Sequence, residues 1–171
     1  MVHIKRAGVS DAAVISFLGQ QTFTETFGHL FTAAELNKYL DDTFNIQKLQ
    51  SSLLKPHNIF GVLYHAGITV GYYEMKLDSC YGAASNLNHV QLRKIYMLKD
   101  YANKKFGIAM LEDILGLKEI KDCTTIWLVV LHTNARAVKF YESNGFKKLA
   151  DHYYTIGQHD LAYDLMVKNM R

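Results

Sequence analysis

Apolar residues recur every three or four positions over the first third of the chain, as they do along one face of a helix. Thr32 and Glu35 form a capping-box pattern that marks a helix start, and Gly28 and Pro56 mark helix ends. In chain order, this region is predicted to contain a strand at 2–6, a helix from Ser10-Asp11 to Gly28, a helix from Thr32 and a short helix at 44–54. The first third is therefore mainly helical after one strand.

Strand patterns replace the helical spacing in the middle of the chain. The runs at 59–65 and 69–77 are rich in β-forming residues, and Ala66-Gly67 between them predicts a turn, so we expect an antiparallel hairpin. The small, polar segment at 78–88 is predicted to be a loop. Further on, the continuous apolar run at 124–131 has the composition of a strand that is buried on both faces.

One stretch between these strands combines a strand, a turn and a helix. Apolar and charged residues alternate at 92–98, a polar turn covers 99–105, and the helix that begins at Phe106-Gly107 repeats its apolar positions three or four apart. The first amides of a helix have no acceptor inside it, and the helix dipole is positive at that end, so the backbone there can bind a phosphate. A glycine in such a turn also serves plain packing, so this signal alone leaves both interpretations open.

The last third supplies the remaining elements. A helix at 134–144 is followed by the two last strands, at 146–149 and 161–168, around an irregular segment. The element order is then β, helices, β, β, β, α, β, α, β, β. It predicts an α/β (α+β) fold with a mostly antiparallel sheet, in which the strands at 92–98 and 124–131 diverge. Ligands bind at such openings, by the carboxyl ends of the strands.

The composition narrows the class of protein. With 171 residues, of which 49% are hydrophobic and 20% charged, the chain has the size and composition of one globular domain, 1–171. A net charge of +3 without a basic cluster argues against a nucleic-acid binder. No apolar run approaches the ~20 residues of a membrane span, and the N-terminus lacks a signal-peptide core. Cys80 and Cys123 lie far apart in the sequence. We therefore expect a cytoplasmic protein with reduced thiols that binds neither membranes nor nucleic acids.

The segment at 133–148, TNARAVKFYESNGFKK, resembles the N-x-x-A-x-x-F-Y-x-x-x-G-F signature of the GNAT superfamily of N-acetyltransferases. The matching residues are Asn134, Ala137, Phe140, Tyr141, Gly145 and Phe146. The segment follows a strand, loop and helix like those of 92–116, which is the order that the family has. The resemblance implies a GNAT-type twisted central sheet of six to seven strands flanked by helices. It also implies that the strands at 92–98 and 124–131 are splayed to form the cofactor cleft.

The resemblance further implies how acetyl-coenzyme A (acetyl-CoA) would bind as co-substrate. Met97 and its neighbours Tyr96 and Leu98 would bond the pantetheine, which would act as an added β-strand. The backbone amides that would hold the pyrophosphate belong to Lys104, Lys105, Phe106, Gly107, Ile108 and Ala109. Asn134 would contact the cofactor from the second helix, and Tyr141 would lie by the thioester sulfur.

The predicted pyrophosphate loop departs from the family pattern Q/R-x-x-G-x-G/A. Lys104 occupies the first position, and Phe106 stands where smaller or charged residues are more common. Gly107 and Ala109 match the pattern. Because the loop would hold the cofactor mainly through amides, we expect binding to persist, with added attraction from the lysines at 104 and 105.

Further segments look like the bacterial spermidine/spermine (polyamine) N-acetyltransferases. They are QTFTETFG at 21–28, VGYYEMKL at 70–77, KIYML at 94–98 and YYTIGQHDLAYDLMVK at 153–168. This branch of the family implies that the acceptor is a polyamine or a related small amine.

Acyl transfer to an amine needs a neutral nucleophile, a polarised carbonyl and a proton for the departing thiolate. The resemblance implies direct attack in a ternary complex, with the Met97 amide bound to the carbonyl oxygen and Tyr141 as general acid. Helical periodicity alone indicates that Tyr141 is a packing residue beside Phe140. Glu25 and Glu74 are candidates to bind or deprotonate a cationic amine, although each is also interpreted as a solvated carboxylate.

The eight histidines do not form a ligand set, so no metal is predicted. His132, at a strand end, is interpreted as a hydrogen-bonded structural residue. Two other functions stay open: a protein or peptide N-acetyltransferase, and a non-catalytic acetyl-CoA-binding sensor, which the irregular loop at 104–109 makes plausible. The expected partner is a small-molecule amine, and a homodimer is possible.

Overall fold

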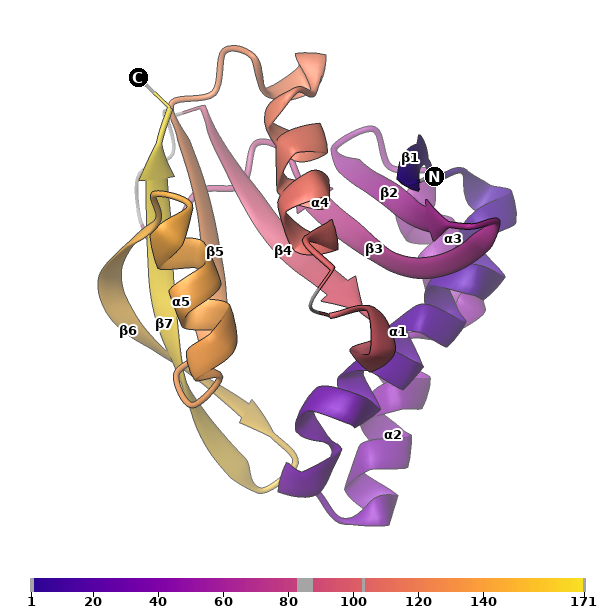
Figure 1. The fold of residues 1–171 in the computed structure, drawn as a ribbon. Coiled ribbons are helices and arrows are strands. Elements are labelled where there is room, and N and C mark those ends of the chain that lie inside the picture. Colours follow the sequence, from indigo (N-terminus) through magenta and orange to yellow (C-terminus); the bar gives the residue numbers. More distant parts are fainter. Residues whose placement is uncertain (1, 83–87, 103, 171) are drawn as a thin grey trace. The chain divides into compact units, whose positions relative to one another are not determined.

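The computed structural model of the protein describes residues 2–82, 88–102 and 104–170. Within these ranges lies a seven-stranded, mostly antiparallel open sheet in the order β1-β2-β3-β4-β5-β7-β6, flanked by helices (Figure 1). The strands are β1 (Val2–Arg6), β2 (Asn58–His65), β3 (Ile68–Lys76), β4 (His89–Met97), β5 (Thr125–Leu131), β6 (Lys147–Ile156) and β7 (His159–Asn169). The helices are α1 (Ala12–Phe27), α2 (Ala33–Thr43), α3 (Ile46–Leu53), α4 (Phe106–Leu115) and α5 (Ala135–Ser143). Short 3-10 turns are η1 (Val9–Asp11), η2 (Gly28–Leu30), η3 (Lys99–Tyr101) and η4 (Lys118–Ile120). The predicted α/β fold and the predicted element order are confirmed.

The chain divides into two compact units. Unit 1 comprises residues 1–75 and 94–118, and unit 2 comprises residues 76–93 and 119–171. Strand β4 belongs to both, because its first half lies in unit 2 and its second half in unit 1. The residues at the end of β4 and the start of α4 therefore fall in unit 1, and those of α5 fall in unit 2.

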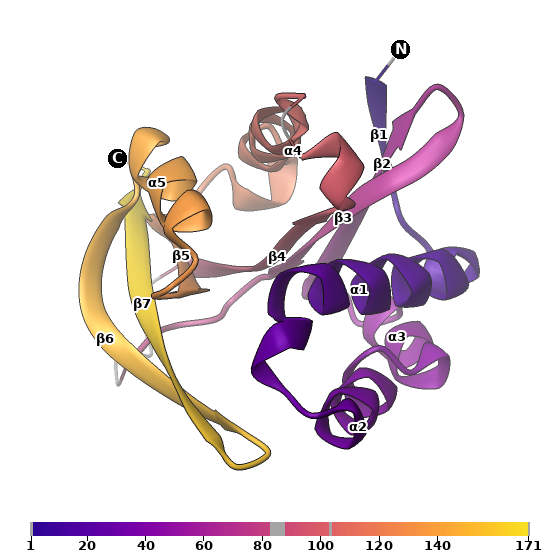
Figure 2. The same ribbon diagram turned by 60° about the horizontal axis from the view of Figure 1, so that its bottom comes forward.

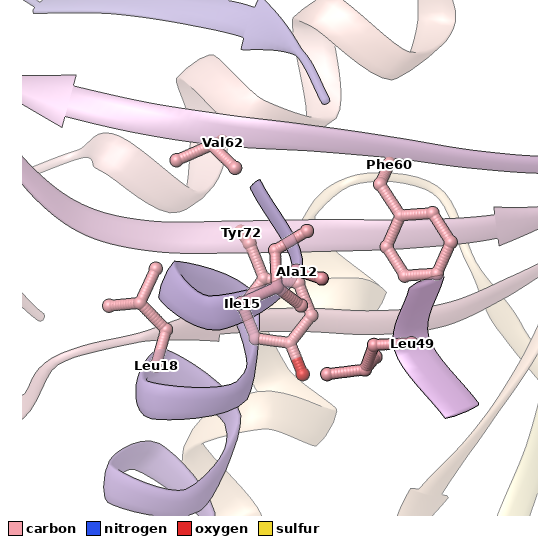
Figure 3. Packing of buried hydrophobic residues seen from close by; sticks show 7 residues of the cluster. All are labelled: Ala12, Ile15, Leu18, Leu49, Phe60, Val62 and Tyr72. Carbon is pink, nitrogen blue, oxygen red and sulfur yellow. The ribbon is translucent and has the colours of Figure 1, made fainter. Parts of the chain in front are cut away.

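In unit 1, helices α1 and α3 cover one face of the first strands. The buried cluster between these layers consists of Ala12, Ile15, Leu18, Leu49, Phe60, Val62 and Tyr72 (Figure 3). Helix α4 lies on the opposite face of β3 (Figure 2), where the Tyr73 hydroxyl donates to the Asp113 carboxylate at 2.7 Å. Because side chains alternate along a strand, the adjacent residues Tyr72 and Tyr73 serve opposite layers.

Local signals start and stop these elements as the sequence predicts. The Thr32 N–H and hydroxyl donate to the Glu35 carboxylate at 2.9 Å, and the Glu35 N–H donates back to the Thr32 hydroxyl at 3.3 Å. This capping box begins α2. Ala66-Gly67 adopts left-handed φ angles of 49° and 83°, which form the tight turn between β2 and β3. The predicted capping box and hairpin are both confirmed.

In unit 2, the first half of β4 pairs in parallel with β5. The paired residues are His89 with Thr125, Val90 with Ile126, and Gln91 with Trp127. Strand β5 then pairs antiparallel with β7, and β7 pairs antiparallel with β6. The Trp127 indole N–H donates to the Ser79 carbonyl at 2.5 Å, which ties the segment after β3 to β5.

The strand predicted at 161–168 is confirmed as part of β7, whereas the predicted end of the strand at 146–149 and the irregular segment after it are wrong. Strand β6 continues to Ile156 and β7 begins at His159, so the two form one long hairpin. A register shift between Lys148 and Ala150 interrupts the alternation of side chains, and most β6 side chains are exposed. The strand therefore carries little hydrophobic pattern, and its pairing with β7 defines it instead.

Smaller differences concern element ends and loops. Strand β4 begins at His89 rather than at Leu92, and Phe44 caps α2 while Asn45 caps α3. Residues 83–87 of the predicted 78–88 loop, and residue 103 of the predicted 99–105 turn, lie outside the described residues. In the part of the chain that the structure describes, no helix is long and apolar enough to cross a membrane.

Candidate active site

The end of β4 in unit 1 presents the Met97 amide on one edge of the strand. The Leu98 N–H donates to the Val70 carbonyl of β3 at 2.9 Å. Successive N–H groups of a strand point to opposite edges, so the Met97 N–H is directed away from β3. The Tyr96 ring instead packs against the α1 face, with its centroid 5.7 Å from that of Tyr72. Of the three residues predicted to bond pantetheine, Met97 has the amide that faces away from β3.

Gly71, on the neighbouring strand, allows this part of β4 to lie close. A Cβ atom added at Gly71 would lie 2.6 Å from the Tyr96 carbonyl oxygen, so a side chain there would push the two backbones apart. Gly71 was not predicted to belong to the site. The signal that could have revealed it is a glycine inside a strand, which often marks a close backbone approach.

The start of α4 presents a row of backbone amides. Lys105 is its N-cap and has a left-handed φ of 61°. The Ala109 N–H donates to the Lys105 carbonyl at 3.2 Å, which is the first hydrogen bond of the helix. The amides of Phe106, Gly107 and Ile108 come before that bond, and the helix dipole is positive at this end. These residues therefore suit a pyrophosphate group.

Phe106, which departs from the family loop pattern, anchors the start of α4 through its side chain. Its side chain is buried, with its ring centroid 5.0 Å from that of His65 and 6.4 Å from that of Tyr101. The Lys104 ammonium lies 4.9 Å from the centroid of the Tyr101 ring, within cation–π range. The phenylalanine side chain thus packs beneath the loop while its amide stays at the first turn of the helix.

Glu25 connects the end of α1 to the residues that follow β4. One carboxylate oxygen accepts the Lys99 N–H at 2.9 Å, and the other accepts the side-chain amide of Gln21 at 2.8 Å. The side chain is exposed, as predicted for a solvated carboxylate. Both of these donors are uncharged, so they leave the negative charge of Glu25 in place.

Glu74 is not a solvated carboxylate, so this interpretation is wrong for it. Its side chain is 5% exposed and accepts a 2.6 Å bond from the Lys94 ammonium, whose side chain is 15% exposed. The two residues lie on the neighbouring strands β3 and β4. One carboxylate oxygen of Glu74 is therefore already occupied by a charged donor. Lys94 was not predicted to belong to the site, because its partner lies 20 residues away in the chain.

In unit 2, Asn134 begins α5 and Tyr141 lies within it. The Asn134 side-chain oxygen accepts the Ala137 N–H at 3.2 Å, so Asn134 is the N-cap of the helix. Tyr141 is buried between the rings of Phe140 and Phe146, at 5.2 and 5.5 Å between centroids. Burial raises the pKa of the Tyr141 hydroxyl well above its ordinary value, so the phenol is protonated at neutral pH. Its catalytic role stays a prediction.

His132 at the end of β5 has the hydrogen bond expected of a structural residue. Its Nδ1 lies 2.9 Å from a carboxylate oxygen of Asp164 on β7, and the Lys148 ammonium lies 2.7 Å from the same oxygen. Burial alone would raise the pKa of Asp164, but the hydrogen bonds from Lys148 and His132 lower it below its ordinary value. Among the described residues, no three His, Cys, Asp or Glu side chains gather as a metal site would require.

Comparison with known proteins identifies the family. The family model described as an acetyltransferase (GNAT) domain matches residues 56–148, more than half of the chain. The match includes the end of β4, the start of α4 and all of α5. The protein therefore belongs to the GNAT acetyltransferases, which are N-acetyltransferases that use acetyl-CoA.

Individual relatives are distant but span nearly the whole chain. An uncharacterised N-acetyltransferase from the pepI 3′ region of Lactobacillus delbrueckii subsp. lactis is 25% identical over 170 residues, covering 98% of each chain. The spermidine N(1)-acetyltransferase of Thermoplasma acidophilum is 20% identical over 153 residues, which is 85% of this chain and 88% of that one. Among solved structures, the PaiA N-acetyltransferase of Thermoplasma acidophilum in complex with coenzyme A has a TM-score of 0.80 at 18% identity and covers 99% of both chains. At this identity, the structural likeness shows the fold alone.

Proposed function

We propose that this protein transfers the acetyl group of acetyl-CoA directly to a primary amine of a polyamine or related small amine, with both units forming one acetyltransferase domain. One observation carries the proposal. In a chain of the GNAT family, β4 ends at an amide that faces away from β3, and a helix start with three amides ahead of its own hydrogen bonds follows. That order suits a thioester at the strand end and a pyrophosphate at the helix.

Two parts of unit 1 would bind different parts of the coenzyme. At the strand, the Met97 N–H and carbonyl would pair with the pantetheine as a β-partner does. At the helix, the amides of Phe106, Gly107 and Ile108 would hold the pyrophosphate, with Lys104 and Lys105 adding positive charge. In unit 2, the Asn134 side-chain nitrogen would contact the coenzyme, since the side-chain oxygen is taken by the helix cap.

Two groups would act on the reacting atoms. The Met97 N–H would donate to the thioester carbonyl oxygen, where negative charge develops as the acceptor nitrogen forms the new C–N bond. The Tyr141 hydroxyl would give its proton to the sulfur as the C–S bond breaks. The attacking neutral amine loses one proton to water, and water returns one proton to the Tyr141 phenolate, so the proton count balances over the reaction. We do not assign Glu74 as the base, because its carboxylate oxygen already accepts the Lys94 ammonium at 2.6 Å.

Two features support a polyamine as acceptor. One relative is named as a spermidine N(1)-acetyltransferase, and its similarity extends over most of both chains. Glu25, next to the residues that follow β4, retains a negative charge that can attract a protonated second amine of the acceptor. A Glu25→Gln variant removes this charge but keeps an oxygen that can accept the Lys99 N–H.

A thiol-release assay tests the proposal. Purified protein with acetyl-CoA is offered spermidine, spermine, matched monoamines and a panel of peptides, and free thiol is measured. We expect release with the polyamines, and a KM for spermidine that rises roughly threefold to tenfold in Glu25→Gln without a matching change for a monoamine. Release with peptides alone would favour a protein or peptide N-acetyltransferase. Coenzyme binding without release for any acceptor would favour a sensor.

A further inference from the structure

The turn between β5 and α5 contains Asn134, the residue that we assign to the coenzyme. Backbone hydrogen bonds hold this turn at only a few points. The His132 N–H donates to the Ala162 carbonyl of β7 at 3.0 Å, and the Asn134 N–H donates to the Leu131 carbonyl at 2.9 Å. The Asn134 side chain then caps α5. The orientation of Asn134 therefore depends on how firmly the two preceding residues are held.

A side-chain contact adds a further tie to the same turn. Asp164 is the cross-strand partner of Val130, two residues before His132, so the His132 side chain lies on the same face of the sheet as Asp164. The imidazole Nδ1 lies 2.9 Å from the Asp164 carboxylate, whereas 60% of the His132 side chain is exposed. The ring is thus bonded at one nitrogen to β7 and is otherwise largely open to water.

The acceptor in this contact is a fixed, ionised group. The Asp164 side chain is 6% exposed, and its oxygen also accepts the Lys148 ammonium from β6 at 2.7 Å. Lys148 in turn lies 2.7 Å from Asp151 on its own strand. A buried carboxylate that accepts two bonds cannot rotate freely, and a hydrogen bond to a charged acceptor is stronger than one between neutral groups. Since an ionised carboxylate only accepts, the imidazole must carry a hydrogen on Nδ1.

We propose that His132 is a positioning residue, whose Nδ1–H bond to Asp164 holds the β5–α5 turn so that Asn134 can both cap α5 and contact acetyl-CoA. The inference rests on the proposed function, because it takes the coenzyme contact of Asn134 from there. It assigns His132 no contact with substrate and no proton transfer. Loss of the bond therefore affects coenzyme binding and leaves the chemical step intact.

The test measures acetyl-CoA binding by calorimetry and turnover by thiol release in a set of variants. In His132→Ala, the dissociation constant for acetyl-CoA should rise roughly threefold to tenfold, which is the effect expected from loss of a capping interaction. The kcat at saturating substrates should change by less than about twofold. His132→Asn should restore most of the affinity, because its side-chain N–H can donate from nearly the position of Nδ1.

A double-mutant cycle separates positioning from general destabilisation. Asn134→Ala should weaken binding, and adding His132→Ala to it should weaken binding little further, because both changes remove the same contact. The matched control is His152→Ala, at a histidine of β6 whose ring lies 4.4 Å from that of Tyr154 and which should leave affinity unchanged. Melting curves of all variants identify any that fail to fold. If His132→Ala is one of them, His132→Phe, which keeps a ring but has no N–H donor, replaces it in the affinity comparison and in the cycle.

Each outcome bears on one proposal. Equal affinity in the wild type and His132→Ala, with weaker binding in Asn134→Ala, overturns the positioning role and leaves the proposed function standing. Strictly additive losses in the cycle also overturn it. A wild-type protein that does not bind acetyl-CoA overturns the proposed function and the inference with it.

Discussion

The buried ion pair between Glu74 and Lys94 allows a quantitative prediction. It joins β3 to β4 at 2.6 Å, with side chains 5% and 15% exposed. We consider three changes: Glu74→Gln, Lys94→Met and the two together. Each single change leaves a charge whose partner in this pair has gone, whereas the double variant leaves two neutral side chains of similar size.

The magnitudes follow from the difference in burial between the two partners. Removing one member of a buried pair typically costs about 3–5 kcal/mol of the free energy of unfolding. Lys94 has a long aliphatic side chain and is the more exposed partner, so in Glu74→Gln its ammonium can turn toward water. We therefore expect this variant to lose about 2–3 kcal/mol of the free energy of unfolding. Glu74 is shorter and more deeply buried, so Lys94→Met should cost about 3–5 kcal/mol. For a chain of this length, about 1 kcal/mol corresponds to a melting-temperature shift of roughly 2–4 °C.

Urea unfolding followed by circular dichroism gives the free energies, and the cycle isolates the pair. The double variant should lie within about 2 kcal/mol of the wild type, so that it is more stable than the sum of the single losses predicts. The matched control is the exposed pair of Lys38 and Asp42, which lie one helical turn apart at 2.8 Å with side chains 79% and 59% exposed. The corresponding changes, Lys38→Met and Asp42→Asn, should hardly change the free energy of unfolding. This prediction would be contradicted if each single change lowered the free energy of unfolding no more than in this control and if the two changes were additive. Burial would then not make the Glu74–Lys94 pair strong.

Three further predictions concern the site and its support. Tyr141→Phe should lower kcat by about 100-fold while the KM for acetyl-CoA changes by less than about threefold, and unchanged steady-state turnover would remove Tyr141 as general acid. Gly71→Ala should weaken coenzyme binding measured by calorimetry, because the added methyl group meets the Tyr96 carbonyl oxygen; wild-type affinity would show that this part of β4 does not hold the coenzyme. The lowered pKa of Asp164 means that its ionised form stabilises the fold fully above the unfolded pKa near 4, and that this stability is lost as the pH falls through the lower folded value. Unfolding free energies between pH 5 and pH 2.5 should therefore fall less steeply in Asp164→Asn, and parallel curves would contradict this.

Sequence patterns predicted the fold well wherever local interactions define an element. The Thr32–Glu35 capping box and the Ala66-Gly67 turn each involve residues at most three positions apart, and both formed as expected. The signature over 134–146 led to the correct family because its residues are spaced along one helix and the turn after it. Such features are legible in a sequence because the interacting groups are near neighbours in the chain.

The site was only partly predictable, because several of its contacts join distant residues. The signature suggested Asn134 and Tyr141, but it did not show that Asn134 caps α5 or that burial raises the pKa of Tyr141. Phe106 looked like a defect in the loop pattern until the structure placed its ring against His65, 41 positions earlier. Glu74 looked like a solvated carboxylate because nothing in its own neighbourhood of the sequence marks Lys94 as its partner.

By itself, then, the sequence determined the order and type of most elements and the family of the protein, since these follow from periodicity, caps and closely spaced motifs. The tertiary structure decided the length of β6, whose exposed side chains carry little pattern and whose extent depends on pairing with β7. It also decided the ionic contacts of Glu74 and Asp164. The physical reason is common to these cases: strand register and packing bring together groups that are far apart in the chain, and burial then sets whether their charges are paired.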